Sequence, residues 1–63
     1  MSNEMVRNEF ITFLKTNGIK IKTVGERLGI SNSTIYKWKE GTINVSDEKL
    51  KLISDFIKKN TLA

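Results

Sequence analysis

Four polar side chains between positions 32 and 37 can form hydrogen bonds with the edges of nucleic-acid bases. An Asn amide pairs bidentately with adenine, a Lys ammonium reaches guanine or a phosphate, and Ser and Tyr hydroxyls suit several partners. The apolar residues Ile35 and Trp38 are spaced i, i+3, so a helix that turns both inward presents polar residues on its opposite face. The candidate base contacts are Asn32, Ser33, Tyr36 and Lys37.

The distribution of charge favours a nucleic-acid partner over a polar helix face that only meets water. The chain has a net charge of +4. Five basic and two acidic residues give the segment 20–42 a net charge of +3, whereas 1–19 sums to zero and 43–63 to +1. Neutralisation of phosphates supplies most non-specific affinity for DNA. The positive charge therefore lies in the segment that carries the candidate base contacts.

The elements that must position these side chains are predicted to be helices. Apolar residues recur at helical spacing in four stretches, the chain has no Pro, and Gly18, Gly29 and Gly41 follow the first three stretches as end signals. Ser31 and Ser46 can cap the third and fourth helices. The predicted helices cover about 3–16, about two turns from Ile21 to Leu28, 32–40, and a stretch from Ser46 to about Lys59.

The segment 24–38 has the features of two short helices that cross at a tight turn. Such helices need a small residue where they approach, which Gly25 supplies, and a left-handed residue in the turn, which Gly29 supplies. The sequence therefore predicts an all-α fold, a compact four-helix domain over 1–63 that contains a helix-turn-helix. The apolar residues expected to fill the wedge between the two helices are Val24, Leu28, Ile30, Ile35 and Trp38.

The run LGISNSTI at 28–35, followed by WKEG at 38–41, resembles the turn and recognition helix of the phage Cro and repressor type, or XRE-like, helix-turn-helix family. Leu50, Ile53 and Ile57 fall where the next helix of that family has its core positions. The resemblance covers about residues 6–57. It implies a lambda repressor-like fold and a small transcriptional regulator that places the third helix in the major groove of duplex DNA.

The sequence also departs from the family. Lys20 and Ile21 stand where the second helix usually opens with a hydroxyl residue and Gln, so a lysine contact is expected to replace a Gln contact to phosphate. Leu14 stands where an Arg near the end of the first helix pairs with an acid, and Val45 stands at the usual Pro. The short fifth helix that many relatives use in dimers is expected to be missing or vestigial.

In the docking geometry that this resemblance implies, the start of the second helix and the loop after the third helix flank the groove. Basic and small polar residues occur in both places. The candidate phosphate contacts are Lys20, Lys22, Ser31, Lys39, Thr42 and Asn44.

The residue types that the chain lacks exclude several function classes. Having neither Cys nor His, it has no disulfide framework, no zinc-finger ligands and no base for a Ser or Cys catalytic triad. A chain of 63 residues also has little room for a deep enzyme pocket. No apolar run approaches the roughly 18 residues of a membrane span. We therefore expect a cytoplasmic protein that is not an enzyme and uses no metal or cofactor.

The fourth predicted helix has more apolar residues than its core positions require. Either the apolar stripe wraps against the first helix, or part of it forms a dimer surface. One recognition helix reads only a few base pairs, so a weak homodimer on a palindromic operator is expected. The candidate dimer residues are Leu52, Phe56 and Leu62.

The function predicted from these observations is sequence-specific binding of duplex DNA by a Cro- or repressor-like regulator, with a phage or mobile element as a suitable source. One alternative is the DNA-recognition module of a recombination or packaging system, such as an excisionase, a transposase or a small terminase subunit. Another is an antirepressor- or antitoxin-like module that binds a protein. The net charge of +3 on segment 20–42 argues against this last alternative, because binding to a protein gives no reason for such a charge.

Overall fold

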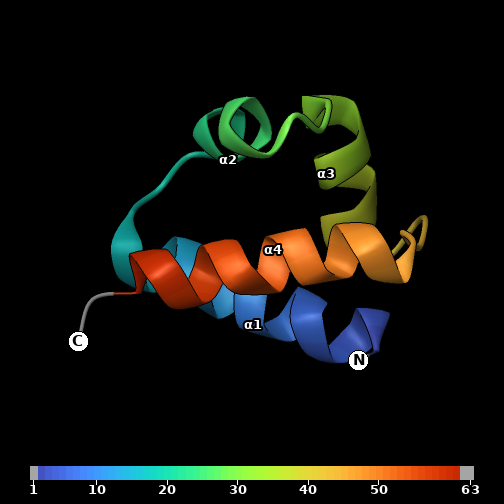
Figure 1. Cartoon of the computed structure of the whole chain (residues 1–63), viewed down its shortest axis with the longest axis horizontal. Coiled ribbons are helices and arrows are strands. Elements are labelled where there is room, and N and C mark those ends of the chain that lie inside the picture. Colours follow the sequence, from blue (N-terminus) through green and yellow to red (C-terminus); the bar gives the residue numbers. More distant parts are fainter. Residues whose placement is uncertain (1, 62–63) are drawn as a thin grey trace.

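The computed structural model describes residues 2–61, which form four helices (Figure 1): α1 (Asn3–Asn17), α2 (Ile21–Leu28), α3 (Asn32–Lys39) and α4 (Asp47–Asn60). The long helices α1 and α4 lie side by side and run in the same direction, while α2 and α3 form a second layer across them. The predicted all-α domain with a helix-turn-helix is confirmed.

Local signals determine where the helices begin and end. The hydroxyls of Ser2, Ser31 and Ser46 accept hydrogen bonds from backbone N–H groups three residues later, at 3.0, 3.2 and 3.3 Å. Each of these serines therefore satisfies one donor of a first helical turn. Gly18 and Gly29 end α1 and α2 in the left-handed conformation, with φ of 64° and 70°. These ends agree with the predicted ones to within about a residue.

The turn between α2 and α3 is tight because of two glycines with different roles. Gly29 supplies the left-handed backbone, and the Ile30 N–H beyond it donates to the Gly25 carbonyl at 3.1 Å. A Cβ atom on Gly25 would lie 2.7 Å from the Ile30 carbonyl oxygen and equally close to Oδ1 of Asn32. Gly25 therefore lies where the two helices approach, as predicted.

The core fills the space between the two layers. Trp38 and Ile35 point into it from α3, and the Trp38 ring packs against Phe10 of α1 with 5.4 Å between ring centroids. Leu28 is half-buried at its edge. Apolar side chains of all four helices and of the turn contribute: Val6, Phe10, Phe13, Ile21, Val24, Ile30, Ile35, Trp38, Leu50, Ile53, Phe56 and Ile57.

The position of Phe56 contradicts the predicted dimer surface. Its ring is only 7% exposed and packs edge-on against Phe13 of α1, at a centroid distance of 5.8 Å. The apolar stripe of α4 wraps against α1 because the two helices lie side by side over most of their length. Leu52 is 43% exposed, and Leu62 lies outside the described residues. The prediction that Phe56 is free for a dimer contact is therefore wrong.

Within residues 2–61, no helix combines the length and apolar character that a membrane crossing requires.

Replacement of Gly29 by Val should destabilise the protein through its backbone alone. A Cβ atom there meets nothing within 4 Å, but the left-handed conformation costs an ordinary residue about 1–2 kcal/mol and a β-branched residue more. In a domain of this size, each kcal/mol lowers the melting temperature by roughly 4–8 °C. Thermal circular dichroism should show a clear decrease for Gly29→Val and a smaller one for Gly29→Asn, which tolerates this conformation. Equal melting temperatures for Gly29→Val and wild type would contradict the turn described above.

Two neighbouring positions of α4 should respond very differently to truncation. Phe56→Ala should reduce the free energy of unfolding by about 3–5 kcal/mol, because it leaves a cavity against Phe13. Leu52→Ala should reduce it by no more than about 0.5 kcal/mol, because that side chain is exposed. Urea denaturation followed by Trp38 fluorescence measures both. Similar losses at the two positions would mean that α4 is rotated relative to the packing described here.

Candidate nucleic-acid interface

The outer face of α3 presents all four candidate base contacts to solvent. Ile35 and Trp38 are buried on the inner face, at 2% and 0% exposed, and hold the helix against α1. The outward side chains are those predicted from the i, i+3 spacing: Asn32, Ser33, Tyr36 and Lys37. The structure therefore gathers them on one accessible surface, and their role as base contacts remains a prediction.

Asn32 lies at the edge of this surface nearest α2. Its Oδ1 would be 2.7 Å from a Cβ atom on Gly25, so the missing side chain of Gly25 provides the room for the Asn32 amide. The same glycine thus allows the helices to approach and allows Asn32 to lie over α2. The amide remains exposed and able to bind a partner.

The candidate phosphate contacts lie at both ends of the helix-turn-helix. Lys20, Lys22, Thr42 and Asn44 are exposed, and Lys39 is half-buried. Ser31 is different, because its hydroxyl caps α3 and lies 2.8 Å from the Thr34 hydroxyl, with which it shares a hydrogen bond. Its side chain already has local partners, so a phosphate contact by Ser31 would have to compete with them.

The N-terminus of α2 lacks the cap that the other three helices have. Lys20 occupies the N-cap position and makes no side-chain capping bond. The N–H groups of a first helical turn that no side chain satisfies carry partial positive charge and favour an anion. Lys20 and Lys22 add two ammonium groups at the same place. This end of α2 therefore combines a helix N-terminus that no side chain caps with two ammonium groups and no acidic residue in its first turn.

Asn3 fixes the connector that follows α3, a role that sequence reasoning missed. Its Oδ1 accepts from the indole Nε1 of Trp38 at 3.0 Å and from the Val45 N–H at 2.9 Å, while its Nδ2 donates to the Val45 carbonyl at 3.2 Å. One amide therefore joins α1, the core tryptophan and the connector.

Arg7, one helical turn after Asn3, contacts the end of α3 and was also missed. Its Nε donates to the Trp38 carbonyl, and one terminal nitrogen, Nη2, donates to the Ile43 carbonyl at 3.2 Å and to Asn44 Oδ1 at 3.1 Å. The guanidinium also lies over the Trp38 ring, 5.6 Å from its centroid. A cation suits the C-terminal end of a helix, where carbonyl groups lack partners.

A sequence signal for these two residues exists. Asn3 and Arg7 are spaced i, i+4 and continue to Phe10 at i+7, so they lie on the same stripe of α1 as the buried aromatic ring. Polar residues within an apolar stripe indicate buried hydrogen bonds. The spacing does not say which distant groups they bind.

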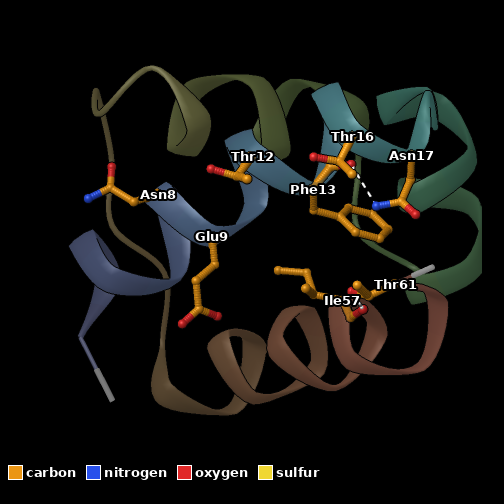
Figure 2. Close-up of a pocket in the computed structure, with 8 residues that line it drawn as sticks. All are labelled: Asn8, Glu9, Thr12, Phe13, Thr16, Asn17, Ile57 and Thr61. Carbon is orange, nitrogen blue, oxygen red and sulfur yellow. Dashed lines mark hydrogen bonds between the residues drawn. The ribbon is translucent and has the colours of Figure 1, made fainter. Parts of the chain in front are cut away.

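A cavity of about 400 Å³ lies between α1 and the C-terminal end of α4 (Figure 2). Phe13 and Ile57 supply its apolar wall, and Glu9 is the one ionisable side chain among the described residues that line it. Residues 2–61 contain no cluster of three potential metal ligands. The cavity is separate from the polar face of α3, because all its lining residues belong to α1 or to the end of α4. These residues are Asn8, Glu9, Thr12, Phe13, Thr16, Asn17, Ile57 and Thr61.

Comparison with known proteins agrees with this geometry. A family model described as helix-turn-helix matches residues 12–62, which include α2, the glycine turn, α3 and α4. No curated protein and no solved structure matches the chain. Because the match covers most of the chain and contains the whole two-helix unit, this chain belongs to the Cro and repressor type, or XRE-like, family of helix-turn-helix DNA-binding domains.

Proposed function

We propose that this protein is a small Cro- or repressor-like transcriptional regulator that binds duplex DNA with α3 in the major groove. The observation that carries the proposal is the outer face of α3. Asn32, Ser33, Tyr36 and Lys37 are all exposed there, while Ile35 and Trp38 anchor the opposite face. A helix of this size fits the major groove, where each base pair presents a distinct pattern of donors and acceptors.

The phosphate contacts of this proposal flank α3 on two sides. Lys20, Lys22 and the uncapped start of α2 would bind the backbone at one edge of the groove. Lys39, Thr42 and Asn44 would bind it at the other edge. The described residues include no ion-pair partner for Lys20 or Lys22, so both ammonium groups are available to phosphates.

The operator in this proposal is palindromic. One α3 reaches only three or four base pairs, which is too few for the affinity typical of specific complexes. Two copies bound about one helical turn apart would read two half-sites. Since Phe56 belongs to the core, the described surface of α4 offers Leu52 for a contact between them, and such a dimer would be weak.

Binding to duplex DNA should weaken steeply as salt is added. Each neutralised phosphate contributes a slope of about −0.9 to log K against log salt. Lys22→Ala should weaken binding to all sequences alike and make the slope shallower by about 0.9. Lys58→Ala, which removes the same charge from the end of α4, is the matched control and should leave the slope unchanged. Fluorescence anisotropy with a labelled duplex at several salt concentrations measures all three proteins. A wild-type slope near zero would end the DNA-binding proposal.

Sequence selectivity should depend on Asn32. Selection of bound duplexes from a random pool should return a palindromic consensus, and Asn32→Ala should cost about 1–3 kcal/mol on that site and little on a scrambled duplex. Asn8→Ala, an exposed Asn on α1, serves as the control. An asymmetric consensus with one-to-one stoichiometry would favour the recombination or packaging module. The absence of any selected sequence, together with capture of a protein, would favour the interaction module.

A further inference from the structure

We propose that Arg7 and Asn44 together form a phosphate-binding site at the end of α3, contributed by α1 and the connector. The inference rests on the DNA-binding function proposed above and adds a contact to it. Arg7 lies before residue 12, where the helix-turn-helix match begins. The guanidinium of the site therefore comes from a part of the chain outside that match, whereas Asn44 lies within it.

The first observation is a guanidinium with unused donors and no counter-ion. Arg7 is half-buried, and its hydrogen bonds all go to uncharged oxygens: the carbonyls of Trp38 and Ile43 and Oδ1 of Asn44. A guanidinium has five N–H groups, and these bonds involve only Nε and Nη2. Within residues 2–61 the Nη1 group has no partner, and no carboxylate pairs with the cation. An uncompensated charge that is partly removed from water favours an added anion.

The second observation is the orientation of the Asn44 amide. A guanidinium only donates hydrogen bonds, so the oxygen of Asn44 must face Arg7 and its Nδ2 must point away. Asn44 is exposed, and no acceptor among the described residues takes a hydrogen bond from its Nδ2. Arg7 thus orients Asn44 as a donor. A donor amide next to a guanidinium matches the acceptor oxygens and the charge of a phosphate.

The third observation is the position of this pair relative to α3. The bond from Nε to the Trp38 carbonyl holds the guanidinium at the C-terminal end of that helix. Lys39 and Thr42, two other candidate phosphate contacts, belong to the same end of α3 and the connector after it. Arg7 would therefore add a charged phosphate contact next to Asn44 along one edge of the groove. The hydrogen bonds of the guanidinium and its position over the Trp38 ring limit its freedom before DNA binds.

The test compares two Asn→Asp substitutions. Asn44→Asp keeps an acceptor for Arg7, but its carboxylate offsets the positive charge of the guanidinium, and the Nδ2 donor of Asn44 is lost. Asn8→Asp makes the same charge change on an exposed Asn of α1 with no hydrogen bond to Arg7. We expect both variants to keep the wild-type melting temperature or exceed it. Relative to Asn8→Asp, Asn44→Asp should bind the duplex at least about tenfold more weakly, with a salt slope shallower by about 0.9.

A second variant separates a phosphate contact from mere positioning of the connector. Arg7→Gln keeps a donor near the carbonyl groups but removes the charge, so the salt slope should again be shallower by about 0.9. If Arg7→Gln does not fold, Asn44→Asp decides alone. Equal affinity of the two Asp variants, or a loss of affinity with the wild-type slope, would overturn the site. If wild type shows no salt-dependent binding, the proposed function fails first, and this is visible in the same titrations.

Discussion

The burial of the Trp38 indole is the interaction on which the position of α3 depends. Helix α3 has only 8 residues, too few to be stable on its own in water. Its inner face is therefore held from outside, by the ring of Phe10, the amide of Asn3 and the guanidinium of Arg7. All three come from α1. These contacts fix which face of α3 is buried and therefore which face points to solvent.

This arrangement explains how a chain of 63 residues without cysteine presents a polar helix face with no disulfide to hold it. The layer formed by α1 and α4 buries a continuous apolar surface, including the contact of Phe13 with Phe56. The helix-turn-helix layer then rests on that platform with its charged residues outward. Every buried side-chain polar atom in the described residues has a hydrogen-bond partner, so the small core carries no unpaired donor or acceptor.

The departures from the family pattern acquire a physical meaning in this structure. Leu14, which stands where relatives have an Arg, packs at the edge of the core. Arg7, about two turns before Leu14 on α1, contacts the end of α3. Arg7 binds carbonyl oxygens rather than a carboxylate, so its charge remains available. The Arg7 guanidinium thus lies beside the connector after α3.

The sequence by itself determined the helices, the turn and the polar face of α3. These depend on local rules: serine caps, left-handed glycines and the i, i+3 spacing of Ile35 and Trp38. Only the tertiary structure decided which residues of α4 are covered, because Phe56 lies about 60° around the helix from Ile53 and Leu52 about 100°. Helical spacing alone does not say how far around α4 the neighbouring helix covers it. In the structure α1 covers Phe56 and leaves Leu52 exposed. The partners of Asn3 and Arg7 lie more than 30 residues away, so only the fold could bring them together.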